Sequence, residues 1–292
     1  MPHRSRISEE NAFSYLGTSL DSVSLARDLA AAFEEAACSA GKLALAFYRP
    51  GAATSAEVSH KAEGSPVTEA DYLVDQFLRH RLGQLLPDAG WLSEETEDSS
   101  ARLSKEQVLI VDPIDGTRGF MRGQEGWAIS VALIEHGRPL AGIIHAPALK
   151  ETYVAVRGAG ARLNGSAITV SKLAALRAGA RIAAPGFLAE RLRQTGINFK
   201  LQPRIPSLAL RIANVASGAF DAGFASENAR DWDIAAADII LHEAGGRLAA
   251  LDGREVLYNR ADTRHGPLTA APEQIHAEVN AAALLVNVRS RS

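Results

Sequence analysis

The chain has 292 residues, of which 47% are hydrophobic and 22% are charged, and its formal net charge at pH 7 is −3. This balance is typical of a soluble globular protein and argues against a surface that binds nucleic-acid polymers. The single cysteine, Cys38, excludes an intrachain disulfide and a cysteine-based zinc site. No stretch approaches the roughly 20 consecutive apolar residues of a membrane span, and the first residues lack the apolar core of a signal peptide. We therefore expect a cytoplasmic protein with no membrane partner.

Two helices are expected early in the chain, at residues 21–48 and 68–86, because apolar residues recur there at helical spacing. Thr68 is the candidate N-cap of the second helix. The intervening residues 51–66 are small and polar, and we expect them to form a mobile loop that contains Lys61.

A largely antiparallel sheet should follow, because the next runs are rich in β-branched and apolar residues. The expected strands are residues 90–93, 107–111, 127–134, 140–146 and 151–156. Residues 135–139 read as the turn of a hairpin between two of them.

From about Ser171 the pattern changes to alternating strands and helices, which is typical of a layered α/β arrangement. Strands are expected at residues 181–184, 221–225 and 247–251, and helices at residues 186–195, 207–217, 233–244 and 273–286. We therefore expect an N-terminal extension, an α+β subdomain and an α/β subdomain, at residues 1–20, 21–170 and 171–292. The two subdomains should pack as one compact unit with an active site between them.

Carboxylates stand at the ends of several expected elements. Asp112 and Asp115 follow a fully apolar strand in the stretch VLIVDPIDGTRGF, where charge is costly to bury. Pro113 fixes the backbone between them, so that Ile114 can present its carbonyl oxygen beside the two carboxylates. Two carboxylates and a backbone oxygen form half of an octahedral Mg²⁺ shell. Taken alone, DPIDG is also a good turn followed by an N-cap, and the other carboxylates favour the metal site.

A second class of phosphatase also has paired aspartates at the end of a strand, but its spacing differs from that of this stretch. Phosphatases that use an aspartyl nucleophile end a strand with two aspartates only two positions apart, whereas Asp112 and Asp115 are separated by two residues. A phospho-aspartyl intermediate is therefore not expected.

Four motifs together resemble the inositol monophosphatase superfamily of Mg²⁺-dependent, lithium-sensitive phosphatases. They are SPVTEAD at 65–71, WLSEET at 91–96, VDPIDGTRGF at 111–120 and DWDIAAADIILHEAGG at 231–246. The resemblance covers roughly residues 25–275. It implies a layered α-β-α-β-α sandwich, and homodimers are common in the family.

The resemblance also implies roles for individual residues. Two or three Mg²⁺ ions would be held by Glu94, Asp112, the Ile114 carbonyl, Asp115 and Asp233, with Asp112 bridging two of them. Asp71 would accept a hydrogen bond from Thr117, and Thr117 would orient the attacking water. The N–H groups of Gly116 and Thr117 would hold the phosphate. Together with Glu94, Asp71 and Thr117 form the expected catalytic group.

Several neighbouring residues keep two interpretations. Lys61 is either part of a loop that approaches the metals or a solvated lysine. Glu95 is either a residue that supports the site or a solvated acid. Trp232 reads as a core aromatic that holds Asp233 rigid, and His145 reads as structural.

The substrate is expected to be a small phosphate ester, selected by Ser207 and by residues 226–231. Pro206 and Leu208 stand where the inositol-type pattern has glycine and small residues. Asp231 could reach a substrate hydroxyl, and an acid there also occurs in relatives that act on adenosine 3′,5′-bisphosphate. A 3′(2′),5′-bisphosphate nucleotidase and an inositol-1-monophosphatase are therefore equal alternatives. A sugar bisphosphate or histidinol phosphate is a third.

A hypothesis from another class is a non-catalytic homologue that binds a metal or an anion. The completeness of the carboxylate set argues against it, because a degenerate homologue would usually have lost one of these residues.

Overall fold

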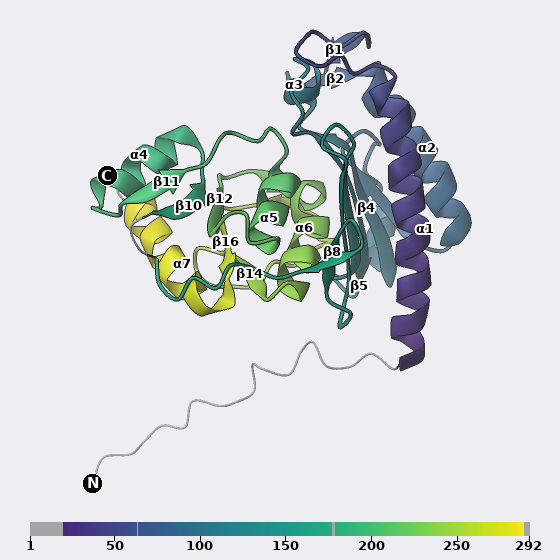
Figure 1. Cartoon of the computed structure of the whole chain (residues 1–292). Helices are drawn as coiled ribbons and strands as arrows, with labels where there is room; N and C mark the ends of the chain where they lie inside the picture. Colours follow the sequence, from purple (N-terminus) through teal and green to yellow (C-terminus); the bar gives the residue numbers. More distant parts are fainter. Residues whose placement is uncertain (1–19, 63, 177–178, 289–292) are drawn as a thin grey trace.

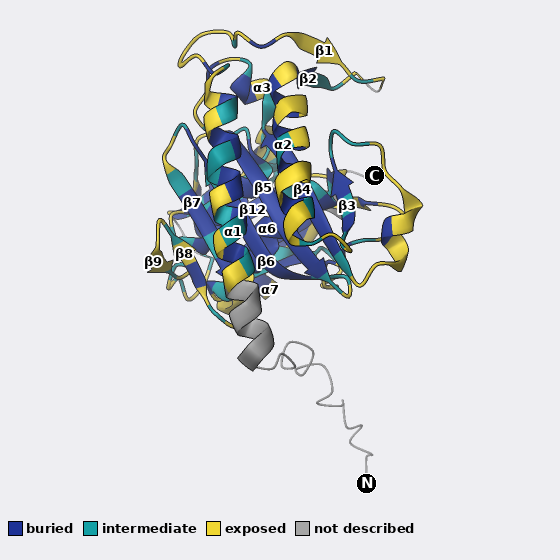
Figure 2. Cartoon of the chain, turned by 90° about the vertical axis from the view of Figure 1, so that its right-hand side faces the viewer, coloured by how far each residue is buried: buried dark blue, intermediate teal, exposed yellow. Residues whose placement is uncertain are grey.

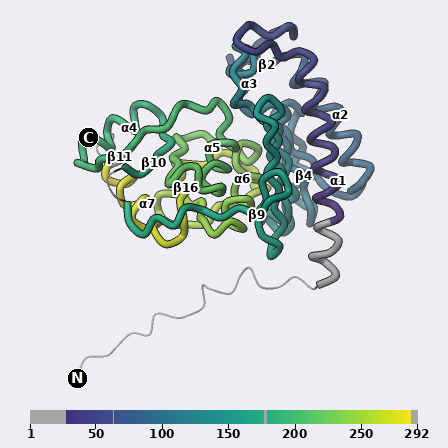
Figure 3. The backbone as a smooth tube through the Cα atoms, viewed as in Figure 1, coloured from purple at the N-terminus to yellow at the C-terminus, as the bar shows by residue number. Residues whose placement is uncertain are grey.

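The computed structural model describes residues 20–62, 64–176 and 179–288. The expected extension, apart from its last residue, lies outside the described residues. The elements form five layers (Figure 1). Helices α1 (Leu20–Leu45) and α2 (Glu69–Leu85) cover one face of a seven-stranded sheet. Helices α5 (Leu208–Ala216) and α6 (Asp231–Glu243) lie between this sheet and a five-stranded sheet (Figure 3). Helices α4 (Gly186–Gln194) and α7 (Glu273–Val288) pack outside the second sheet. The predicted α-β-α-β-α sandwich is confirmed.

The first sheet has the strand order β3-β4-β5-β6-β7-β8-β9, and all neighbours are antiparallel except β3 and β4. Its strands are β3 (Gly90–Ser93), β4 (Gln107–Asp115), β5 (Ala128–Glu135), β6 (Arg138–Ala146), β7 (Glu151–Val156), β8 (Ala161–Leu163) and β9 (Ser166–Ile168). Strands β4 and β5 are buried along almost their whole length because helices cover both faces of the sheet. The strands expected from sequence are all present, and the chain adds β8 and β9.

The second sheet has the order β11-β10-β12-β16-β14. Its strands are β10 (Ala180–Ala183), β11 (Phe199–Leu201), β12 (Ala222–Ala225), β14 (Gly246–Ala250) and β16 (Leu268–Pro272). Strand β16 was not expected, because its sequence LTAAP carries few residues that favour strands. It nevertheless pairs with both β12 and β14, and so forms the interior of the sheet.

The expected mobile loop between α1 and α2 contains a hairpin instead. Strands β1 (Val58–His60) and β2 (Pro66–Thr68) pair antiparallel, and all three residues of β1 are exposed. Lys61 lies at its turn, where its N–H donates to Ser65 O at 2.9 Å. Other short elements are a 3₁₀ helix at Ser100–Ser104, α3 (Thr117–Phe120), β13 (Ala229–Arg230) and β15 (Arg264–His265).

The two covering helices α1 and α2 differ from the central α6 in how they are buried. In Figure 2, α1 and α2 turn buried residues toward the sheet and exposed residues outward. Helix α6 lies between two sheets, and its residues 234–241 are all buried. A Cβ added at Gly142 of β6 would lie 2.6 Å from Ile239 Cγ2, so the glycine lets α6 approach the sheet closely. No described helix is both long and apolar enough to cross a bilayer.

Candidate active site

Three carboxylates from different elements converge at one end of the first sheet. Glu94 follows β3, Asp112 lies near the end of β4, and Asp233 is in the first turn of α6. One oxygen from each lies within 4.8 Å of the other two. Asp112 is buried, and the other two are half-buried.

This group has the chemistry of a site for a divalent cation. Asp112 Oδ2 is buried and has no hydrogen-bond partner among the described residues. Burial raises the pKa of the Asp112 carboxyl well above its usual range, and the charges of Glu94, Asp115 and Asp233 raise it further. Burial and the charge of Asp115 likewise raise the pKa of Asp233. A cation that binds here would relieve the repulsion and satisfy the free oxygen, so the residues fit the hard oxygen ligands that Mg²⁺ prefers.

Strand β4 is irregular where the sequence reads DPID. Asp112 pairs with Ser130 and Asp115 pairs with Ala128, so three steps on β4 oppose two on β5. This bulge turns the chain at the strand end. Within it, Ile114 N donates to Asp112 Oδ1 at 3.1 Å, and the Ile114 side chain is fully buried.

Asp115 lies beside the three carboxylates but binds the start of α5. Its Oδ2 accepts hydrogen bonds from Ser207 Oγ at 2.5 Å and from Ala209 N at 2.7 Å, and its Oδ1 accepts from Leu208 N at 3.2 Å. Burial raises its pKa to about 6, although these hydrogen bonds act in the opposite direction. The structure therefore gives Asp115 a helix-capping contact that sequence reasoning did not anticipate.

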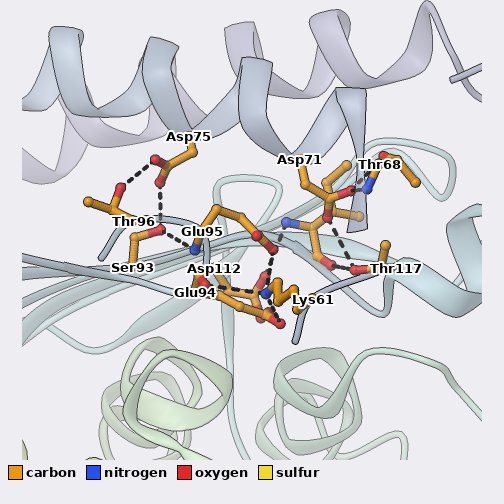
Figure 4. Close-up of polar contacts among 11 residues, drawn as sticks. Lys61, Thr68, Asp71, Asp75, Ser93, Glu94, Glu95, Thr96, Asp112 and Thr117 are labelled. Atoms are coloured by element: carbon orange, nitrogen blue, oxygen red, sulfur yellow. Dashed lines mark hydrogen bonds and ion pairs between the residues drawn. The ribbon is translucent and has the colours of Figure 1, made fainter. Parts of the chain in front are cut away.

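The expected contact between Asp71 and Thr117 is present (Figure 4). Thr117 Oγ1 lies 3.2 Å from Asp71 Oδ1 and 3.0 Å from the Ile114 carbonyl oxygen. Asp71 Oδ2 accepts from Thr68 N and Thr68 Oγ1, so the same carboxylate caps α2. Burial raises the pKa of Asp71 to about 6, against the lowering effect of these bonds.

Lys61 reaches from the hairpin into the carboxylate group. Its Nζ lies 2.9 Å from Glu94 Oε1 and 2.9 Å from Glu95 Oε1. The Glu95 side chain is 2% exposed and its Oε2 has no hydrogen-bond partner, so it is not a solvated acid. Burial raises the pKa of Glu95 to about 7, although Lys61 lowers it. Both residues therefore belong to the site.

Gly116 joins the bulge to α3 in a left-handed conformation, with φ +94°. An added Cβ would lie 2.9 Å from Ser207 N and 3.0 Å from Pro206 Cβ, so only glycine fits without movement. The segment before α5 therefore packs directly against the expected phosphate-binding turn.

The two expected substrate residues, Ser207 and Asp231, are buried and bond other residues of the chain, and their role toward a substrate stays a prediction. Ser207 is fully buried, and its Oγ donates to Asp115 and accepts from Leu210 N at 2.9 Å as the N-cap of α5. Asp231 is fully buried, and its oxygens bond His265 Nε2 at 2.7 Å and Asn259 N at 2.9 Å. Both side chains are buried, and the polar atoms of each have hydrogen-bond partners within the chain.

Two features near the site were missed in the sequence. Asp75, one turn after Asp71, binds the residues on either side of the Glu94-Glu95 pair. Arg211 on α5 carries a positive charge close to Asp115 and Asp233. The i, i+4 spacing of Asp71 and Asp75 was a signal for the first feature. Nothing in the sequence pointed to the second.

Comparisons with known proteins identify the family of this chain. Residues 25–286 match the inositol monophosphatase family. The chain is 36% identical over 208 residues to a histidinol-phosphatase of Mycobacterium tuberculosis, covering 67% of this chain and 78% of that one. It is 36% identical over 211 residues to an inositol-1-monophosphatase of Mesorhizobium japonicum, covering 68% of this chain and 76% of that one. It is 30% identical over 244 residues to the 3′(2′),5′-bisphosphate nucleotidase CysQ of Aggregatibacter actinomycetemcomitans, covering 80% of this chain and 88% of that one.

A solved structure has the same fold. The extragenic suppressor protein suhB of Bartonella henselae superposes with a TM-score of 0.76 at 28% identity, covering 86% of this chain and 96% of that one. The fold and the site thus define a phosphoric monoester hydrolase of a Mg²⁺-dependent class. The chain belongs to the inositol monophosphatase family.

Proposed function

We propose that this phosphatase holds Mg²⁺ between Glu94, Asp112 and Asp233 and hydrolyses the phosphate ester of a small alcohol. The observation that carries the proposal is the convergence of three carboxylate oxygens within 4.8 Å around the unpartnered Asp112 Oδ2. Bound Mg²⁺ supplies charge neutralisation of the phosphate and a lowered pKa for an attacking water.

Further ligands complete the proposed site. The Ile114 carbonyl oxygen belongs to the bulge between Asp112 and Asp115, and would be the backbone ligand of the first ion. A second ion would take Asp233 and Asp115, whose Oδ1 accepts a single hydrogen bond of 3.2 Å and so retains a free lone pair. Two or three ions per site remain the expected number.

Thr117 is the proposed orienting residue for water. Its hydroxyl has one proton and two acceptors in reach, Asp71 Oδ1 and the Ile114 carbonyl oxygen. With the proton directed to either acceptor, the oxygen lone pairs are left to accept a hydrogen bond from water. A water held in this way points its own lone pair away from Thr117, toward a phosphorus atom in the site.

Phosphate recognition is assigned to the turn at Gly116. The first N–H groups of a helix have no acceptor within that helix, and α3 begins at Thr117 directly after the glycine. The N–H groups of Gly116 and Thr117 would therefore donate to phosphate oxygens.

Arg211 favours a substrate with a second anionic group. Its Nε donates to Ser207 O at 3.3 Å, which fixes the guanidinium near the site, and none of its terminal nitrogens bonds a described residue. Burial lowers the pKa of Arg211, and the negative charge of Asp115 acts in the opposite direction. The positive charge of Arg204 also lowers this pKa, so the two guanidinium groups lie near each other. A pair of guanidinium groups would suit a second phosphate. This favours a bisphosphate, such as adenosine 3′,5′-bisphosphate, over inositol 1-phosphate.

Phosphate release by the purified full-length chain tests this function. Inositol 1-phosphate, adenosine 3′,5′-bisphosphate, fructose 1,6-bisphosphate and histidinol phosphate would be compared with Mg²⁺, with EDTA and with millimolar lithium. We expect Mg²⁺-dependent, lithium-inhibited release, with the highest kcat/KM for a bisphosphate. Arg211→Gln should raise the KM for the bisphosphate roughly tenfold or more and leave that for inositol 1-phosphate unchanged.

Two outcomes would count against the proposal. Release from none of the four esters would contradict the proposed substrate class. Full turnover in Glu94→Gln would contradict the ligand assignment. A cytoplasmic location and a homodimer stay predictions, and sedimentation of the purified chain measures the second.

A further inference from the structure

The loop that carries Glu94 and Glu95 is tied to a helix outside the carboxylate group. It begins directly after β3, and Glu94 N donates to Val111 O of β4 at 3.3 Å. The side chains immediately before and after the glutamate pair, Ser93 and Thr96, both extend toward α2 (Figure 4).

Asp75 of α2 binds both of these side chains. Ser93 Oγ donates to Asp75 Oδ1 at 2.5 Å, and Thr96 Oγ1 donates to Asp75 Oδ2 at 2.6 Å. Ser93 Oγ also accepts a hydrogen bond from Glu95 N at 3.3 Å. Asp75 is only 5% exposed, so its carboxylate is committed to this loop rather than to water. One carboxylate therefore brackets the glutamate pair from both sides.

Asp75 acts from the same helix face as Asp71. They are four positions apart, which is about one turn and a rise of about 6 Å. Asp71 binds Thr117, the first residue of α3, and Asp75 binds Ser93 at the end of β3 and Thr96 in the loop after it. The helix itself docks on the sheet through apolar side chains such as Val74 and Leu78, which are fully buried. The two aspartates are thus free to set the position of the loops that carry the candidate ligands.

We propose that Asp75 is a positioning residue for Mg²⁺ binding. It fixes Ser93 and Thr96, and through them the orientation of the Glu94 carboxylate. This inference rests on the proposed role of Glu94 as a metal ligand. Residues that hold a metal ligand in place typically change metal affinity by about 10–100-fold when they are removed.

Calorimetric titration of Mg²⁺ into the full chain without substrate tests this role. Asp75→Ala should raise the Kd for Mg²⁺ by about 10–100-fold. Ser93→Ala and Thr96→Val should each raise it less, because one hydroxyl remains bonded. Asp75→Ala combined with Thr96→Val should bind Mg²⁺ no more weakly than Asp75→Ala alone, since both changes remove the same hydrogen bond.

Asp221→Asn is the matched control. Asp221 is also 5% exposed, and it bonds Arg181 beside the second sheet at 2.7–3.0 Å. Its substitution should lower the Tm and leave the Kd for Mg²⁺ unchanged. If Asp75→Ala does not fold, Asp75→Asn replaces it, because asparagine retains the shape of the side chain. The Kd for Mg²⁺ is then measured for Asp75→Asn and for Thr96→Val.

Two results separate the possible failures. If the Asp75 and Thr96 variants bind Mg²⁺ with the wild-type Kd and only their Tm falls, Asp75 is structural and the inference is wrong. If Glu94→Gln itself leaves the Kd unchanged, the ligand assignment of the proposed function is wrong instead. Loss of binding in Glu94→Gln, together with weaker binding in the Asp75 variants, supports both.

Discussion

At Asp112 the structure places a carboxylate where burial and neighbouring carboxylates disfavour its charge. The side chain is 1% exposed, and Oδ2 has no hydrogen-bond partner in the described part of the chain. Within that part, the carboxylate accepts one hydrogen bond, from Ile114 N to Oδ1. A residue in this position lowers the stability of the fold. Residues at functional sites often do so, because they are retained for what they bind.

Asp112→Asn should therefore stabilise the metal-free protein and inactivate it. The amide carries no charge to be repelled by Glu94, and its oxygen can still accept from Ile114 N. Turnover with Mg²⁺ should fall by about 10²–10³-fold, the range measured when one electrostatic contact is lost from an active site. Thermal unfolding in EDTA and phosphate release with Mg²⁺ measure the two effects.

The gain in stability should depend on pH. The pKa of Asp112 is raised in the folded state. Above about pH 4, the unfolded chain therefore binds fewer protons at this residue than the folded protein does. The free energy of unfolding of the wild type therefore falls as the pH rises. Asp112→Asn has no carboxyl at this position and lacks that loss. The difference should be largest at neutral pH and narrow toward pH 4. Asp98→Asn, at an ion pair between the exposed Asp98 and the buried Arg102, should show no such gain. A lower Tm for Asp112→Asn in EDTA at pH 7 would contradict the argument.

At the scale of elements, the site depends on how the segment before α5 fits against the chain around α3. Gly119 in α3 and Gly126 before β5 both face the segment that ends at Pro206. A Cβ at Gly119 would lie 2.4–2.5 Å from atoms of the Pro206 ring. The ring is rigid, so the contact can be relieved only by a movement of the backbone around Gly116, the proposed phosphate-binding turn.

Gly119→Ala should therefore destabilise the protein by about 1–3 kcal/mol, the typical cost of overpacking, and should lower turnover. Gly83→Ala is the matched control. Gly83 lies in α2 with no atom within 4 Å of the added Cβ, so alanine should stabilise by about 0.5–1 kcal/mol. Chemical denaturation of both variants gives the two values. Equal stabilisation by both changes would show that the contact with Pro206 is not rigid.

At the scale of the whole molecule, the candidate ligands come from two different layers. Glu94 and Asp112 belong to the first sheet, whereas Asp233 begins the helix between the sheets. A metal bound by all three therefore links these layers, and its binding energy adds to the stability of the fold.

Mg²⁺ should accordingly raise the Tm in a concentration-dependent way. At 100 times its Kd, a ligand that binds only the folded state adds about 2.7 kcal/mol. Differential scanning calorimetry at increasing Mg²⁺ measures the effect, with potassium chloride of equal ionic strength as the control. Asp233→Asn should remove most of the shift while leaving the Tm in EDTA near or above that of the wild type. A Tm that does not respond to Mg²⁺ would mean that the three carboxylates do not hold the metal together.

Much of the fold was accessible from local patterns. The long helices and the strands of the first sheet lie close to their predicted positions, because hydrophobic periodicity and caps such as Thr68 are local properties. Strand β16 and the hairpin of β1 and β2 were not predicted. Their sequences carry little strand preference, and pairing with a partner strand decides their conformation.

The sequence by itself determined the family, the layered architecture and the identity of the candidate ligands, because motifs and residue chemistry are read along the chain. Only the tertiary structure brought Glu94, Asp112 and Asp233 within 4.8 Å. It alone showed that Ser207 and Asp231 are buried and bonded within the chain. The physical reason is that burial and hydrogen-bond partners are set by elements far apart in the sequence, which meet only when the layers pack.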